Sequence, residues 1–450
     1  MVELSRRQLL AAAALGGAAL LGPLTRSLSR ERPFTRSLRR ESASAPLLRG
    51  VFRVDNRSSS TGRMGDYVFL AARSEFAWPS GSTIKFGTMT IPAAQCTPYA
   101  NALLFHVPAH LAGTVPVTAR AGGVTSNAVD FTYLPSDVTA STGLYRGYGT
   151  VRVEEASLTH PVRYGVGYLG NGRETDWSAN EPSPHVIGGE YRFWQNGGVM
   201  VWQTAMLPAL SSGASLEAGA QGAYDSHWTR LATAFMTSIP GPSYFSIGWE
   251  YSNANYFPWG VTSLADALHY AAYYQRIVDV MRLTLARGDP NLKANVEFKF
   301  GWNFNRGPSR VPDLIETSYP GDAFVDVVGF DFYDSGYRFA RRPDGTWADP
   351  SDVWSHYLSD PYSLDWLSQF AIDHGKAVGF PEWGLVGLHP KSALGGGDDP
   401  FFISAFSAWL AKQPRLAYHC YFDFDPLTTD GTYHSLQNFP RSAVAFKTHF

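Results

Sequence analysis

The sequence predicts an α/β protein in which a (β/α)8 TIM barrel follows a small all-β sandwich module. The chain has 450 residues, which is too long for one ordinary single-core domain but suits a barrel of about 250 residues and a smaller module. Residues 50–134 contain short strand-like runs without helical periodicity, whereas strand-like and helical stretches alternate from residue 145 onward. A hydrophobic content of 44% is normal for a chain that folds around a core.

Residues 1–48 form a leader that we expect to be an export signal followed by a disordered linker. The paired Arg6 and Arg7 precede a short apolar run that is rich in Ala and Gly. The pattern S-R-R-x-L-L resembles the twin-arginine signal of bacteria, which exports folded proteins. We therefore expect a periplasmic or extracellular protein, with no stable membrane span in the mature chain. An uncleaved N-terminal anchor is the alternative.

Residues 49–136 are predicted to form the β-sandwich module. Short runs rich in β-formers alternate with Gly, Pro, Ser and Asn, as at 67–70, 83–86, 102–107 and 115–119. The segment resembles the immunoglobulin-like modules that often precede the catalytic domains of secreted hydrolases. Such modules sometimes bind sugar but more often act as spacers or docking surfaces, and we expect a structural role.

Residues 137–450 are predicted to form the barrel. Seven strand-like runs occur at 162–168, 199–202, 244–249, 296–302, 325–332, 377–380 and 417–422. Helical stretches at 223–239 and 264–287 lie between them, and Gly288 is a suitable C-cap for the second. Repeated βα units predict parallel strands joined by helical crossovers. A doubly wound open sheet is the alternative, but no G-x-G-x-x-G fingerprint opens the region.

Composition narrows the possible partners. Outside the first 50 residues acidic side chains outnumber basic ones, which argues against a nucleic-acid partner. No metal-binding or phosphate-binding motif occurs, so we predict no metal and no cofactor.

We expect Cys96 and Cys420 to be buried free thiols, and an interdomain disulfide is the alternative. Aromatic residues make up 14% of the chain and include 13 Trp, and such rings stack on the C–H faces of sugars or fill a large core.

Two glutamates directly follow strand-like runs. Counting backward from the last run as the eighth strand, Glu250 follows the predicted fourth strand and Glu382 the seventh. The C-terminal ends of barrel strands face the active site. Retaining hydrolysis of a glycosidic bond uses two carboxyl groups about 5–5.5 Å apart, one protonated and one ionised. A single glutamate at a strand end is more often a cap partner or a surface charge. Two of them, each flanked by Trp in an aromatic-rich chain, favour catalysis.

Residues 213–334 resemble glycoside hydrolase family 26, best known for β-mannanases. The resemblance is carried by the segments G-A-Q-G-A-Y-D at 219–225, N-Y-F-P-W at 255–259, G-D-P-N at 288–291 and, most specifically, Y-P-G-D-A-F-V-D-V-V-G-F-D-F-Y at 319–333. The segment 381–384 is similar to the family's nucleophile strand, which usually has Phe where Trp383 stands. The resemblance implies that Glu250 is the acid/base, that Glu382 is the nucleophile and that Tyr333 hydrogen-bonds near the nucleophile.

The chain departs from the family around Glu250. The family usually has His immediately before the acid/base glutamate and Asn two residues after it, and both contact sugar near the cleavage point. Trp249 and Ser252 occupy these positions here. This difference bears on mannan specificity more than on the two-glutamate chemistry.

Aromatic and polar residues near the two glutamates are the predicted substrate contacts. Tyr256 and Trp259 lie in the loop after Glu250, where loop packing is the alternative. The complete predicted set is Trp249, Tyr256, Trp259, Trp302, Asn303, Tyr333 and Trp383. Asp331 is predicted to orient a neighbour or to be a buried polar residue. Asp423 is predicted to serve turn geometry before Pro426, and a contact with a sugar hydroxyl is the alternative. We expect His389 and His419 to hydrogen-bond or pack.

The sequence therefore predicts a retaining, endo-acting glycoside hydrolase that cleaves a β-linked polysaccharide without a cofactor. β-Mannan, β-glucan, xylan and exopolysaccharide are the candidate substrates. One alternative is a catalytically inactive carbohydrate-binding protein on a hydrolase-like barrel. The other is a transglycosylase, in which a sugar replaces water as the acceptor.

Overall fold

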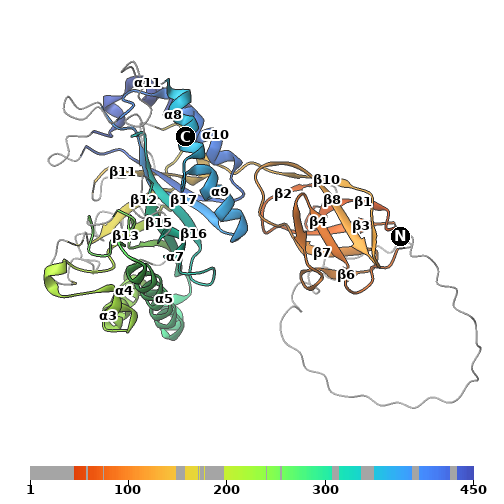
Figure 1. Cartoon of the computed structure of the whole chain (residues 1–450), viewed down its shortest axis with the longest axis horizontal. Helices are drawn as coiled ribbons and strands as arrows, with labels where there is room; N and C mark the ends of the chain where they lie inside the picture. Colours follow the sequence, from red (N-terminus) through yellow and green to blue (C-terminus); the bar gives the residue numbers. More distant parts are fainter. Residues whose placement is uncertain are drawn as a thin grey trace, which may run out of the picture. The chain divides into compact units, whose positions relative to one another are not determined.

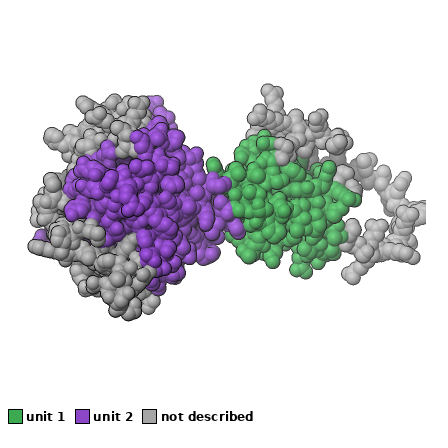
Figure 2. Space-filling view, turned by 90° about the horizontal axis from the view of Figure 1, so that it is seen from above, with its two compact units in different colours: residues 1–108, 113–134 green, residues 109–112, 135–450 purple. Residues whose placement is uncertain are grey.

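The computed structural model of the chain describes residues 45–56, 59–73, 76–147, 158–170, 172, 177, 197–239, 241–253, 256–306, 314–335, 349–387, 395–425 and 433–450. The predicted export signal and His389 lie outside these residues. The chain divides into two compact units, Met1–Pro108 with Gly113–Leu134 and Ala109–Ala112 with Pro135–Phe450 (Figure 2). None of the helices in the described part combines the length and apolar character that crossing a membrane requires.

The first unit consists of β-sheets around a core of its own. One sheet has the order β1 (Leu48–Arg53), β3 (Tyr67–Ala72), β7 (Ala102–His106) and β6 (Thr97–Tyr99). The other has the order β2 (Thr61–Gly62), β10 (Val129–Tyr133), β8 (Gly113–Ala121), β4 (Thr83–Phe86) and β5 (Met89–Ile91), with β9 (Val124–Thr125) paired to β8. Both sheets contribute to one hydrophobic cluster that includes Val68, Phe105, Val117 and Phe131. The predicted all-β character is confirmed, and the immunoglobulin-like assignment stays a prediction.

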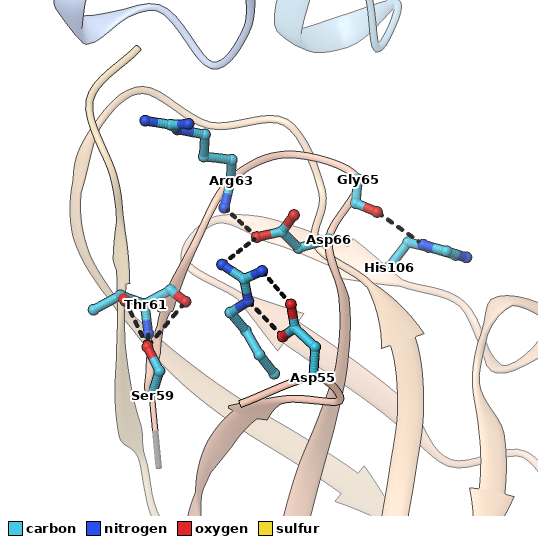
Figure 3. A network of polar contacts seen from close by, with 8 residues as sticks. Asp55, Ser59, Thr61, Arg63, Gly65, Asp66 and His106 are labelled. Atoms are coloured by element: carbon cyan, nitrogen blue, oxygen red, sulfur yellow. Dashed lines mark hydrogen bonds and ion pairs between the residues drawn. The ribbon is translucent and has the colours of Figure 1, made fainter. Parts of the chain in front are cut away.

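A polar network ties the turns that follow β1 and β2 (Figure 3). The Arg53 guanidinium donates to both carboxylate oxygens of Asp55, at 2.8 and 2.5 Å, and lies 3.8 Å from the Asp66 carboxylate. The backbone N–H of Arg63 donates to Asp66 at 2.9 Å. Because the Asp55 side chain is exposed and those of Arg53 and Asp66 are partly exposed, these ion pairs add little to stability.

The second unit is a closed parallel barrel (Figure 1). Its strands run in sequence order: β11 (Thr142–Tyr145), β12 (Tyr164–Leu169), β13 (Val199–Thr204), β14 (Pro242–Ile247), β15 (Glu297–Asn305), β16 (Val327–Tyr333), β17 (Ala377–Gly384) and β18 (Leu416–Phe422). β18 pairs in parallel with β11 and closes the ring. The predicted (β/α)8 barrel is confirmed, and the open-sheet alternative is wrong. β14 and β17 are the fourth and seventh barrel strands, as predicted.

In the described part of the chain, helices follow each of the barrel strands from β13 to β18. Those in the described part are α3 (Leu216–Ala220), α4 (Asp225–Ser238), α5 (Leu264–Arg287), α6 (Pro290–Lys293), α7 (Leu314–Thr317), α8 (Pro350–Ser359), α9 (Leu364–Asp373), α10 (Pro400–Lys412) and α11 (Pro440–His449). The longest, α5, begins where the Ser263 hydroxyl accepts the backbone N–H of Asp266. Its apolar face is buried and includes Tyr270, Tyr274 and Ile277.

Strand alternation separates two apolar layers. Side chains that point outward from the barrel, such as Trp202, Phe245 and Phe330, join the large core shared with the helices. Inward-pointing side chains, such as Val201 and Cys420, form a smaller cluster inside the barrel. Cys420 and Cys96 are both buried and free, so the predicted free thiols are confirmed and the disulfide alternative is wrong.

Candidate active site

Glu382 reaches the barrel interior because β17 contains a bulge. Between Phe380 and Trp383, β17 has one residue more than the paired stretch of β18, and its pairing with β16 is shifted in the same way. Phe380 points outward to the helices, so strict alternation would point Glu382 outward as well. The extra residue reverses the alternation, which turns Glu382 inward and Trp383 outward. Pro381 suits a bulge because it has no N–H to donate.

Glu250 is held in a strained turn that follows β14. Gly248 has φ +59° and Glu250 has φ +52°, the left-handed region that residues with a Cβ rarely adopt. A Cβ at Gly248 would lie 2.5 Å from Met206 Sδ, so this position requires glycine. Glu250 N–H donates to the Asn303 carbonyl at 3.1 Å, and Asn305 Nδ2 donates to Glu250 Oε1 at 2.6 Å. These bonds maintain a backbone conformation that costs about 1–3 kcal/mol, and such strain is common at functional sites.

The Glu382 carboxyl is buried and accepts three hydrogen bonds. Tyr168 Oη and Gln203 Nε2 donate to Oε1 at 2.7 and 3.1 Å, and Tyr333 Oη donates to Oε2 at 2.7 Å. Burial raises the pKa of Glu382, and the bonds from Tyr168, Tyr333 and Gln203 lower it. All three donors favour the ionised form.

The two glutamates have unequal environments, because Glu382 accepts three side-chain hydrogen bonds and Glu250 accepts one. Burial and the nearby charge of Glu382 raise the pKa of Glu250 to about 8, and the Asn305 bond opposes this shift. The carboxyls are therefore close enough to interact electrostatically. The pKa of about 8 retains a proton on Glu250 at neutral pH, whereas three donors favour the ionised form of Glu382, and this kind of difference separates a general acid from a nucleophile.

A third carboxyl, Asp331, is buried inside the barrel. Burial and the charges of Glu382 and Glu250 raise its pKa well above the usual range. Asn303 Nδ2 donates to Asp331 Oδ1 at 2.9 Å. Asn303 is only 2% exposed and lies one inward position deeper in the barrel than Asn305. The predicted contact of the Asn303 side chain with substrate is thus replaced by its bond to Asp331.

The predicted substrate contacts of Trp302 and Trp383 are wrong, because both rings are fully buried on the outer face of the barrel. Trp302 stacks on Phe370 of α9 at a centroid distance of 5.4 Å. Trp383 packs against Phe406 of α10 at 4.8 Å. Alternation along β15 and the bulge in β17 direct these rings away from the glutamates.

The loop after Glu250 contains one exposed ring and several buried ones. Trp259 is fully buried, stacks on Phe257 at 4.7 Å and donates Nε1–H to the Trp249 carbonyl at 2.8 Å. The loop-packing alternative therefore holds for Trp259, and its predicted sugar contact is wrong. Trp249 is 3% exposed and packs edge-on against Tyr168, so it supports a donor to Glu382. Tyr256 is 61% exposed, and its substrate contact stays a prediction.

The site contains residues that the sequence interpretation missed. Tyr168, Gln203 and Asn305 occupy inward positions near the C-terminal ends of β12, β13 and β15, and each bonds to one of the glutamates. Gln203 carried a visible signal, a polar residue immediately after an apolar strand run. Ser252 also contributes, because its hydroxyl accepts the backbone N–H of Asn305 at 3.0 Å and so orders the residue that bonds Glu250.

Other polar residues near the barrel ends are structural. Asp423 accepts hydrogen bonds from Arg146 Nε at 2.7 Å, the Ser435 hydroxyl at 3.0 Å and the Leu436 N–H at 2.8 Å. Pro426 lies outside the described residues, so the turn role of Asp423 before it stays a prediction. His419 is buried, and its Nε2 bonds with the Val138 carbonyl at 3.1 Å, which confirms that it hydrogen-bonds and packs.

Comparison with known proteins identifies the family that this site resembles. The model of glycosyl hydrolase family 26 matches residues 245–341, and the predicted resemblance is confirmed for that segment. The segment contains Glu250 and Tyr333 but ends before Glu382. A mannan endo-1,4-beta-mannosidase from Bifidobacterium adolescentis is 33% identical over 171 residues, which cover 37% of this chain and only 15% of that protein.

Two solved structures are similar to this chain at low sequence identity. GH26C from a Muricauda species is similar over 70% of this chain and 85% of that chain, with a TM-score of 0.46 and 18% identity. A modular endo-beta-1,4-mannanase from Cellulomonas fimi is similar over 68% of this chain and 69% of that chain, with a TM-score of 0.43 and 19% identity.

Proposed function

We propose that the protein is a retaining glycoside hydrolase that cleaves a β-linked polysaccharide by double displacement, with Glu250 as acid/base and Glu382 as nucleophile. The observation that carries the proposal is the unequal environment of the two glutamates. Glu382 accepts three hydrogen bonds, whereas burial and the charge of Glu382 raise the pKa of Glu250 to about 8. A nucleophile and an acid need this difference in proton affinity.

The proposed reaction has two steps. Glu250 donates its proton to the leaving glycosidic oxygen while a Glu382 oxygen attacks the anomeric carbon and forms a glycosyl-enzyme ester. Glu250, now ionised, takes a proton from water, and the resulting hydroxide attacks the same carbon and releases Glu382. Tyr168 and Tyr333 hold the Glu382 carboxylate in place through their hydroxyl groups.

β-Mannan is the first substrate to test, because the matched segment and the mannosidase relative both point to it. Trp249 and Ser252 stand where the family usually has sugar-contacting His and Asn, and both are buried here. β-Glucan, xylan and bacterial exopolysaccharide are therefore included as proposed substrates. Tyr256, with its exposed ring, is the proposed aromatic contact in the loop after Glu250.

Full-length protein should be incubated with mannan, xylan, mixed-linkage glucan and exopolysaccharides, with Glu382→Ala as the matched control. We expect reducing ends to be released from one of these polymers by the unmodified protein and not by the variant. Proton NMR should show the β-anomer first. Undiminished activity of Glu382→Ala would reject the nucleophile assignment, and first release of the α-anomer would reject retention. Binding without turnover of any polymer would favour the carbohydrate-binding alternative.

We also propose that residues 1–48 direct export by a twin-arginine route. The support is the Arg6–Arg7 pair ahead of a short apolar run. Changing both arginines to lysine should retain the protein in the cytoplasm of an expressing bacterium, as measured by fractionation. Unchanged export of the variant would reject the proposal.

A further inference from the structure

Asn305, which bonds Glu250, is followed directly by a buried arginine. The Arg306 side chain is 11% exposed, and its guanidinium carbon lies 4.5 Å from the centre of the Tyr357 ring. Arg306 Nε donates to the Ser363 hydroxyl at 2.8 Å, and that hydroxyl donates to the Tyr357 carbonyl. The end of β15 is therefore attached to the C-terminal part of α8.

The same tyrosine is bonded to the end of the neighbouring strand. Tyr357 Oη donates to Asp334 Oδ1 at 2.8 Å, and Asp334 directly follows Tyr333, the donor to Glu382 Oε2. Asp334 N–H donates to the Gly384 carbonyl at 2.9 Å, two residues beyond Glu382. Asp334 is 1% exposed, and within the described residues Tyr357 supplies the one hydrogen bond to its carboxyl.

We propose that Arg306, Tyr357 and Asp334 are positioning residues that set the proton affinities of the two glutamates. We name these three residues the buried clamp. One end of the clamp orders Asn305 against Glu250, and the other orders Tyr333 against Glu382. The catalytic role of the clamp rests on the proposed function. The positions and the pKa values of the two glutamates can be measured on the folded chain without any substrate.

The composition of the clamp supports positioning over simple packing. Among the described residues Arg306 has one acidic neighbour, Asp360, at 3.6 Å, and that carboxylate is 40% exposed. A buried guanidinium with so weak a partner costs desolvation free energy, and apolar side chains of similar volume would pack there more favourably. The polar groups fix the relative orientation of these side chains. The planar Arg306 guanidinium over the Tyr357 ring, and the Tyr357 hydroxyl bonded to Asp334, each allow one arrangement. An apolar cluster would tolerate small displacements of Asn305 and Tyr333, and such displacements would weaken the bond from Asn305 to Glu250 and the bond from Tyr333 to Glu382.

The test measures the two carboxyl groups directly. Full-length protein labelled with 13C at the glutamate carboxyl is titrated by NMR, and Glu250→Gln and Glu382→Gln identify the two signals. Arg306→Met should loosen Asn305 and raise the pKa of Glu250, and Tyr357→Phe should loosen Tyr333 and raise the pKa of Glu382. Complete loss of one hydrogen bond to a carboxylate corresponds to a shift of about one to two pKa units. Asp360→Asn is the matched control, because it removes a contact of Arg306 outside the clamp, and it should shift neither group.

The outcomes separate the clamp from the proposed function. Unshifted titration of both glutamates in folded Arg306→Met and Tyr357→Phe, with only a lower Tm, would overturn the clamp and leave a packing role. The selective shifts would support it even if no glycan were hydrolysed, in which case the proposed function alone would fail. If Arg306→Met does not fold, Arg306→Lys serves instead, because it retains the charge and loses the planar stacking and the Nε bond. On any hydrolysed glycan, the pH profile of kcat/KM should move on its alkaline side for Arg306 variants and on its acid side for Tyr357→Phe.

Discussion

Removal of one hydroxyl group from Tyr333 should change the pH at which Glu382 becomes ionised. In the described part of the chain, Glu382 Oε2 accepts its hydrogen bond from Tyr333 alone, at 2.7 Å, while Oε1 has two donors. Tyr333→Phe leaves the ring in place and removes only this bond. Because the bond stabilises the ionised carboxyl, its loss raises the pKa of Glu382.

The size of the effect follows from the kind of bond. A hydrogen bond to a charged group contributes about 1.5–3 kcal/mol, which corresponds to about one to two pKa units. The acid side of the kcat/KM profile should therefore move upward by about one to two pH units. The alkaline side should move less, because it reports the pKa of Glu250, which accepts its hydrogen bond from Asn305.

The assay is kcat/KM as a function of pH on the best polymer or an activated aryl glycoside. Tyr270→Phe is a matched control, because the Tyr270 hydroxyl is buried and bonds the Ile247 and Gly248 carbonyls near the end of β14 without touching Glu382. The control should lower Tm and leave the acid side in place. An unmoved acid side in Tyr333→Phe, or an equal movement in Tyr270→Phe, would refute the argument.

Three further predictions test the site. With azide and an activated β-glycoside, Glu382→Ala should give the α-glycosyl azide and Glu250→Ala the β-azide; the reverse products would exchange the two roles. Because the folded pKa of Glu250 is raised from 4.5 to about 8, its contribution to stability is fully present below pH 4.5 and is lost as pH rises through 8. Glu250→Gln should therefore gain Tm relative to the unmodified protein between pH 5 and 8, and a pH-independent difference would contradict this. Gly248→Ala should lower stability by about 2–4 kcal/mol, because a new Cβ would lie 2.5 Å from Met206 Sδ and φ is +59°. Gly65→Ala, at φ +84° with open space, should cost only about 1–2 kcal/mol in the same unfolding measurement.

The sequence alone determined the architecture and the catalytic candidates. Alternating strand and helix patterns predicted the barrel, because the spacing of apolar residues along a segment follows from the local backbone geometry of a strand or a helix. Glu250 and Glu382 were identified because each directly follows an apolar run, and the ends of parallel barrel strands lie on one face. The family resemblance also implied that Tyr333 hydrogen-bonds near the nucleophile, and the structure has this bond from Tyr333 to Glu382 at 2.7 Å.

Only the tertiary structure decided which side chains surround the glutamates. A bulge reverses the alternation of β17 and so exchanges the faces of Glu382 and Trp383. Pro381 is compatible with a bulge, but it does not by itself give the direction of either side chain. Tyr168 and Gln203 are far from Glu382 in the chain, and closure of the barrel brings their strands to it. Sequence patterns record what each residue prefers locally, whereas the inward or outward direction of a side chain and the pairing of distant strands depend on the register of the whole barrel.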